Sequence, residues 1–179
     1  NTDTRKGWET KEVQNDVATK GFHSITLTVK QLGPTASILT DILGYQLQKQ
    51  EGTRYRFSTD AIGNASIVDI VEAPSLAPGR GAAGTNHHVA FRVKNDDILM
   101  EFREKIASKG LSITPKIDRD YFFSLYFREP GGVLFELATD NPGFTRDEPL
   151  NELGTSLRLP KQYEGNRKQI EGLLPVLQD

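Results

Sequence analysis

The sequence predicts an α+β fold in which two βαβββ repeats form a curled mixed sheet round a cleft, followed by a C-terminal extension. Short runs rich in β-branched residues alternate between apolar and polar positions, as half-buried strands do. Each half of the chain also has one segment with apolar residues at helical spacing. These segments follow the same order twice, and matching landmarks recur about 65 residues apart, which indicates an internal repeat. The landmark pairs are His23 with His87, Gly44 with Gly110, and Asp69 with Glu136.

The first repeat is predicted over residues 21–73. Residues 21–29 alternate and are rich in β-branched side chains, which favours a strand. Residues 34–43 carry isoleucine and leucine at helical spacing. The proline at the start of this segment and Gly44 at its end suit the first turn and the end of a helix. Three further strands are expected at residues 45–51, 54–58 and 65–71.

The second repeat is predicted over residues 85–140, after a connecting loop at residues 74–84 that is rich in proline and glycine. Residues 87–93 alternate like a strand. Residues 96–107 have helical spacing, and Gly110 suits the end of that helix. Three further strands are expected near residues 112–115, 122–128 and 133–137.

Both ends of the chain differ from the repeats. Residues 1–20 are polar with isolated apolar side chains and resemble a linker, and the only methionine is Met100. We therefore expect residues 1–20 to connect to an N-terminal half that this sequence does not include. Residues 141–179 are predicted as an extension with a short helix near residues 167–177, which Pro175 interrupts.

The composition narrows the possible partners. The chain has a net charge of −2 and no long basic run, which argues against nucleic acid as a ligand. It has no cysteine, which excludes disulfides, cysteine–zinc sites and cysteine nucleophiles. No stretch approaches the roughly 20 apolar residues of a membrane helix, and we expect a cytoplasmic protein.

Two residue types in the second repeat point to a metal site. His87 and His88 are adjacent in a predicted strand, so His88 shares one face with Ala90 while His87 points to the other face. Glu136 is a lone carboxylate within an apolar strand, where burial is costly unless it meets a cation. The sequence therefore predicts that His88 and Glu136 meet as metal ligands. A purely structural His–carboxylate pair is the alternative.

A third ligand is less evident. Aligning the repeats places Ser24 where His88 stands and Asp69 where Glu136 stands. A hydroxyl is a poor ligand for a transition metal, and redox-active iron sites commonly use two histidines and one carboxylate. Asp69 is a possible third ligand. The register of His23 corresponds to His87 and argues against His23 as a ligand.

The repeats and their motifs resemble the vicinal oxygen chelate superfamily, which includes glyoxalases, extradiol dioxygenases and bleomycin-resistance proteins. More narrowly, the chain resembles the C-terminal half of hydroquinone-type ring-cleaving dioxygenases, which have four such repeats. The similarity covers nearly the whole chain. It rests on residues 86–91, 118–122, 126–136 and 138–144.

This resemblance implies an Fe(II) site held by two histidines and one glutamate, with Mn, Zn or Ni as alternative metals. His88 and Glu136 match two of the ligands, and the third would come from the N-terminal half. His87, Arg119 and Tyr126 match catalytic positions that line the substrate side. The resemblance also implies a small aromatic substrate and O₂, and we expect this chain to be inactive without its N-terminal half.

Other functions remain open at this stage. A glyoxalase-like isomerase or a metal-dependent thiol transferase would use the same ligands without redox change. A metal-free binding or resistance module is favoured by Ser24, because one repeat has lost its ligand. Arg119 is flanked by two aspartates and could be a solvated charge, while Tyr126 lies in an aromatic run that could be core. The repeats could also pair between two copies in a homodimer.

Overall fold

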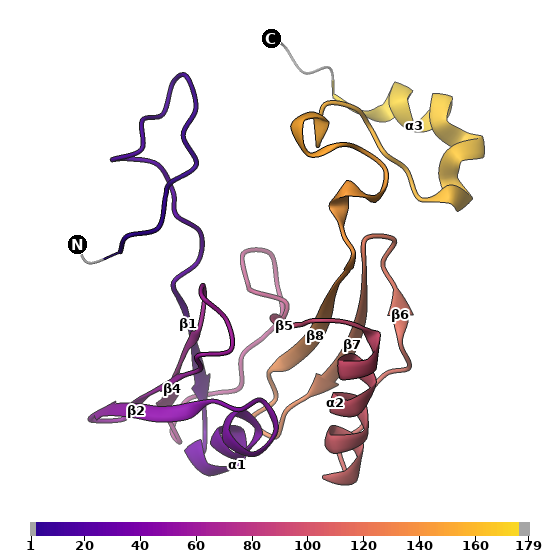
Figure 1. Ribbon diagram of the computed structural model, residues 1–179. Helices are drawn as coiled ribbons and strands as arrows, with labels where there is room; N and C mark the ends of the chain where they lie inside the picture. The colour runs from indigo at the N-terminus through magenta and orange to yellow at the C-terminus, as the bar shows by residue number, and fades with distance from the viewer. Residues whose placement is uncertain (1–2, 176–179) are drawn as a thin grey trace.

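The computed structural model describes residues 3–175 and confirms the α+β class with two βαβββ repeats (Figure 1). The first repeat contains β1 (Ser24–Val29), α1 (Leu32–Ser37), the π-helical turn η1 (Ile38–Ile42), β2 (Gln46–Glu51), β3 (Arg54–Ser58) and β4 (Ile67–Glu72). The second contains β5 (Val89–Val93), α2 (Asp96–Ser108), β6 (Ile117–Asp118), β7 (Phe122–Arg128) and β8 (Leu134–Pro142). The extension contains the 3₁₀ turns η2 (Phe144–Arg146), η3 (Leu150–Glu152) and η4 (Lys161–Asn166), then α3 (Arg167–Leu173).

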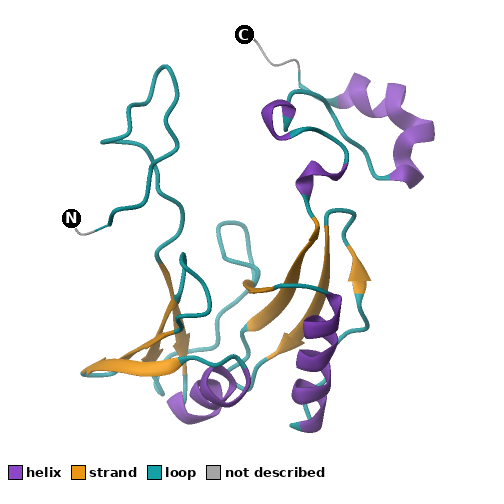
Figure 2. Cartoon of the chain, in the orientation of Figure 1, coloured by secondary structure: helices purple, strands orange, loops and turns teal. Residues whose placement is uncertain are grey.

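Each repeat forms its own four-stranded mixed sheet. The strand orders are β1-β4-β3-β2 and β5-β8-β7-β6, so the first strand of each repeat pairs in parallel with the last. The predicted single curled sheet is thus divided in two, because β1 and β5 are edge strands bonded only to their own repeat in the part of the chain that is described. Figure 2 shows the two groups of strands standing apart, with the helices between and beside them.

Several element boundaries differ from the sequence-based expectation. β5 begins at Val89, so His87 and His88 lie in the segment that leads into it. The strand expected near residues 112–115 reduces to a single bridge at Ile113, because it ends in a proline that has no N–H for a ladder. β8 runs beyond Leu137 to Pro142.

The terminal segments extend from the same end of the two sheets (Figure 1). Residues 3–20 form no helix or strand. In the extension α3 stops at Leu173, earlier than expected, and residue 177, the predicted helix end, lies outside the described residues. No helix among residues 3–175 is long and apolar enough to cross a membrane.

The repeats meet through buried contacts. Tyr45 and Phe91 pack edge to face with ring centroids 6.0 Å apart. The buried Thr35 hydroxyl in α1 donates to Glu129 Oε2 at 2.6 Å, which joins the first repeat to the β7–β8 turn. Gly131 completes this contact, since a Cβ there would lie 2.6 Å from Thr35 Oγ1.

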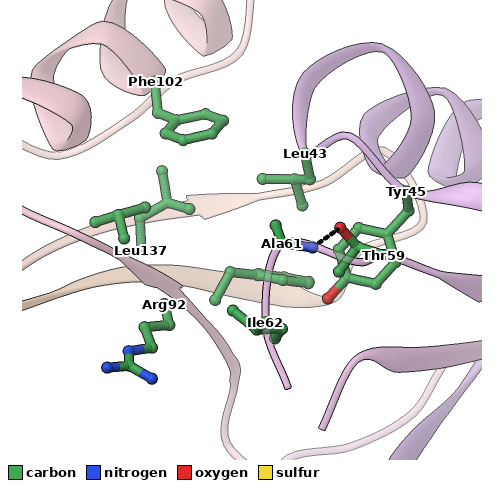
Figure 3. A pocket seen from close by; sticks show the side chains of 10 residues that line it. Leu43, Tyr45, Thr59, Ala61, Ile62, Arg92, Phe102 and Leu137 are labelled. Carbon is green, nitrogen blue, oxygen red and sulfur yellow. Dashed lines mark hydrogen bonds between the residues drawn. The ribbon is translucent and has the colours of Figure 1, made fainter. Parts of the chain in front are cut away.

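A small cavity of about 50 Å³ remains between the repeats. Leu43, Tyr45 and Ile62 line it from the first repeat, and Phe102 and Leu137 line it from the second (Figure 3). Its lining is largely apolar, so this region belongs to the shared core rather than to the site described next.

Candidate metal centre and substrate cleft

Glu136 lies at the centre of the second sheet. β8 runs between β5 and β7, and Glu136 pairs with Ala90 on one side and with Tyr126 on the other. Its neighbours Phe135 and Leu137 are fully buried in the core, so strand alternation turns Glu136 to the opposite face. Glu136 is nevertheless only 3% exposed, because side chains from the flanking segments cover it.

His88 meets Glu136 as the sequence predicts. His88 Nε2 lies 2.7 Å from Glu136 Oε2, and the imidazole is about one-third exposed. Two ligand atoms that bind one metal at right angles, each about 2.1 Å away, lie roughly 3 Å apart. The 2.7 Å separation is that of a direct hydrogen bond, as in a structural His–carboxylate pair. An imidazole nitrogen and a buried carboxylate oxygen are also donor types that suit a divalent transition metal.

Tyr126 and Arg119 join the same group. The Tyr126 hydroxyl donates to Glu136 Oε1 at 2.8 Å, and Arg119 Nη2 donates to that hydroxyl at 3.3 Å. The Arg119 guanidinium also lies over the Tyr126 ring, 5.4 Å from its centroid. The rings of His88 and Tyr126 contact edge to face at 5.8 Å. Tyr126 is therefore not simply core, and Arg119 is not simply a solvated charge.

His87 precedes β5 and contacts its neighbour in the chain. Its Nδ1 is 3.0 Å from His88 Nδ1, so one of these nitrogens carries the proton that the other accepts. Because β5 begins only at Val89, the face of His87 expected from strand alternation stays a prediction. The five predicted site residues thus form one continuous series of contacts, in the order His87, His88, Glu136, Tyr126 and Arg119.

The first repeat offers no third ligand. Asp69, the possible ligand, is instead bound by Arg54 Nη1 at 2.8 Å and by Arg56 Nε and Nη2 at 2.8 and 2.9 Å. The hydrogen bonds from Arg56, followed by those from Arg54, hold the pKa of Asp69 below its ordinary range. His23 is exposed and lines a separate hollow beside Arg5. Within residues 3–175, no three His, Cys, Asp or Glu side chains are grouped to hold a metal ion.

An open cleft of about 480 Å³ adjoins His88 and Glu136. Ala90 and Ala138 are small residues beside Glu136 in the lining of this cleft. Tyr121, Phe122 and Phe144 also line it, whereas the ring of Phe91, which borders the cleft, packs in the core against Tyr45 and Phe135. Tyr121 and Phe144 are not predicted site residues, because both lie in turns, where no periodicity indicates the direction of a side chain.

Comparison with known proteins agrees with this fold. Residues 21–137 match the family model described as the Glyoxalase/Bleomycin resistance protein/Dioxygenase superfamily. MhqO of Bacillus subtilis (strain 168), named as a candidate ring-cleaving dioxygenase, is 46% identical over 171 residues, which cover 94% of this chain and 54% of MhqO. A chlorohydroquinone/hydroquinone 1,2-dioxygenase of Sphingobium indicum is 31% identical, over 91% of this chain and 51% of that protein.

Solved structures give the same result. A crystal structure of a candidate dioxygenase from Bacillus subtilis superimposes with a TM-score of 0.86 at 43% identity, covering 96% of this chain and 56% of that chain. The fosfomycin resistance protein FosX of Listeria monocytogenes superimposes with a TM-score of 0.54 at 26% identity, covering 68% of this chain and 93% of FosX. The chain spans about half the length of the curated relatives that it matches. With the matched repeats, the two-sheet fold and these relatives together, the chain belongs to the glyoxalase/bleomycin resistance protein/dioxygenase superfamily.

Proposed function

We propose that this chain provides two of the three metal ligands of an Fe(II)-dependent ring-cleaving dioxygenase that acts on hydroquinone- or catechol-type rings. The observation that carries the proposal is the continuous series of contacts from His87 to Arg119, of which His88 and Glu136 line an open cleft with aromatic residues. The relatives named as ring-cleaving dioxygenases support the reaction type. The Sphingobium indicum relative is named for chlorohydroquinone and hydroquinone, which supports the substrate class.

His88 and Glu136 would hold the metal. When bound, Fe(II) supplies a Lewis acid that acidifies a ring hydroxyl and a redox-active centre that brings O₂ and the ring together. The Tyr126 hydroxyl orients the Glu136 carboxylate through Oε1, which leaves Oε2 beside His88 Nε2. Such supporting hydrogen bonds fix the direction of a ligand and tune its basicity.

The other residues act on charge and protons. Arg119 is exposed and lies over the Tyr126 ring, and a cation so held would stabilise negative charge on the oxygens of a ring that reaches it. His87 contacts His88 through the Nδ1 atoms, and it is the nearest imidazole that can accept or return a proton. The Tyr126 hydroxyl, placed between Arg119 and Glu136, is the second proton donor.

We place the third ligand in the N-terminal half of the longer protein. β5 is an edge strand whose outer side is unpaired within residues 3–175, and His88 immediately precedes it. Exposed strand edges are normally covered or paired. A strand that covers this edge would bring its own side chains next to His88. A second copy of this chain is the alternative source, and the mass of the active species distinguishes the two.

The test is hydroquinone-dependent O₂ uptake by the full-length protein loaded with iron under argon. His88→Ala and Glu136→Ala should each remove one metal ligand, lower the bound iron measured by elemental analysis, and reduce uptake by at least about a hundredfold. His23→Ala is the matched control, because His23 holds the position in the first repeat that His87 holds in the second. It should leave both iron content and uptake unchanged.

Two results would contradict the proposal. Normal uptake by His88→Ala would exclude His88 as a ligand. A wild-type protein that binds a divalent metal but consumes no O₂ with any hydroquinone would instead support isomerase or thiol-transferase chemistry.

A further inference from the structure

Phe144 is a large apolar side chain at the mouth of the cleft, outside the series of polar residues described above. It is 62% exposed, although apolar side chains of this size are normally buried. It lines the same cleft as His88 and Glu136. Its exposure therefore faces the space that a substrate would occupy.

The Phe144 ring is fixed despite its exposure. It stacks on Tyr121 with ring centroids 5.3 Å apart and an interplanar angle of 23°. Gly143 N–H donates to the Tyr121 carbonyl at 2.9 Å, and Arg146 Nη1 donates to the Asp120 carbonyl at 2.7 Å. Gly143 has φ +89°, a conformation that glycine adopts readily and that turns the chain from β8 into η2. The start of the extension is thereby fastened to the β6–β7 hairpin that also carries Arg119.

We infer that Phe144, stacked on Tyr121, forms an aromatic wall of the cleft. This wall determines specificity by packing against the face of the substrate ring and its apolar substituents. The inference rests on the proposed function and adds the residue that selects among ring substrates. The lining of the cleft combines His88 and Glu136 with the small residues Ala90 and Ala138 and with the stacked Tyr121–Phe144 pair. Concave, mostly apolar sites with a few convergent polar groups are typical of small-ligand binding. A wall already held in place adds affinity without an ordering cost.

The experiment uses the full-length, iron-loaded protein with hydroquinone and methylhydroquinone. Binding is measured under argon by calorimetry, and turnover is measured in air by O₂ uptake. Phe144→Ala should weaken anaerobic binding and raise KM by roughly three- to tenfold, the range of one aromatic contact. The loss should be larger for methylhydroquinone, while kcat stays within about twofold because the wall touches no reacting atom.

Two further variants separate this role from folding. Phe144→Tyr keeps the ring face and should bind within about twofold of the wild type. Leu150→Ala, at a 77% exposed position of the same extension outside the cleft, should change neither Kd nor KM. Unchanged ring binding by Phe144→Ala would overturn the inference, as would an equal effect of Leu150→Ala. A lower melting temperature with unchanged ring binding would also overturn it, because it would assign Phe144 to packing.

The inference and the proposed function fail in different ways. If the protein takes up O₂ but Phe144→Ala binds the ring as the wild type does, only the role of Phe144 is contradicted. Ring binding that depends on Phe144, in a wild-type protein without O₂ uptake, supports the wall and contradicts the dioxygenase.

Discussion

Among single residues, Tyr126 is the junction of the site. Its hydroxyl donates to Glu136 and accepts from Arg119, while its ring contacts His88. One side chain thus touches both proposed metal ligands and a cation. Replacing Tyr126 with phenylalanine removes only the hydroxyl oxygen and keeps the ring that contacts His88.

Tyr126→Phe tests this junction. The change leaves Glu136 Oε1 without its donor and Arg119 Nη2 without its acceptor, so the carboxylate loses its fixed orientation. We expect iron affinity, measured by chelator competition, or kcat/KM to fall by about 10- to 100-fold. Tyr163→Phe, at a half-exposed position in the extension, is the control and should have no effect. Values equal to the wild type in both assays would show that the hydroxyl is dispensable.

Among elements, β4 and β8 present a carboxylate at matching positions of the two sheets. Asp69 pairs with Arg56 across β3 and β4, and Glu136 pairs with Tyr126 across β7 and β8. Asp69 is 1% exposed and Glu136 is 3% exposed. The carboxylate in β4 is satisfied within its own repeat, whereas the one in β8 retains an oxygen beside His88.

Asp69→Asn tests the role of the first carboxylate in stability. The folded-state pKa of Asp69 lies below its ordinary value of 3.8, so its stabilising contribution is present above that value and is lost as the pH falls through the folded-state pKa. The free energy of unfolding should therefore differ most between wild type and variant near pH 6, and the difference should shrink toward pH 2.

The exposed Asp60 provides the control for this comparison. Asp60→Asn should unfold like the wild type at every pH. The difference in the free energy of unfolding between the wild type and Asp69→Asn could instead stay constant down to pH 2. That result would show that the ion pairs with Arg54 and Arg56 do not stabilise the fold.

In the molecule as a whole, the polar contacts between the repeats include the exposed ion pair of Lys109 with Asp41 and a buried hydrogen bond to Glu129. The Glu129 carboxylate is 2% exposed and accepts hydrogen bonds from Thr35 Oγ1 and from the N–H groups of Gly131 and Val133. Only the first of these donors comes from the other repeat. The relative placement of the two sheets therefore depends on this hydroxyl and on the surrounding apolar packing.

Thr35→Val removes that donor while keeping the shape of the side chain. It removes one of the hydrogen bonds to a buried carboxylate, while Oε2 keeps the one from Gly131 N–H, and a hydrogen bond to a charged group contributes about 1.5–3 kcal/mol. Denaturant unfolding should show a loss of this size. Thr40→Val, at an exposed position of the following turn, should cost less than about 0.5 kcal/mol. Equal stability of Thr35→Val and the wild type would show that packing alone joins the repeats.

The sequence predicted local features better than the relation between them. Alternation, helical spacing and the repeat predicted β3, β7 and α2 almost to the residue, and they brought His88 to Glu136. The strand predicted from His87 begins only at Val89, because periodicity cannot locate the first residue of a strand. The separation of the sheets and the position of Phe144 depend on contacts between distant segments, which leave no periodic pattern.

The matching positions of Asp69 and Glu136 also bear on how a duplicated unit diverges. In each copy, the strand beside the carboxylate supplies its partner: arginine in one copy and tyrosine in the other. Arginine neutralises the carboxylate, whereas tyrosine only orients it and leaves its charge for an ion. A substitution at the partner position, Arg56 or Tyr126, can thus change whether the carboxylate is available to an ion, while the strand pairing stays the same. Selection can then act on the site without changing the fold.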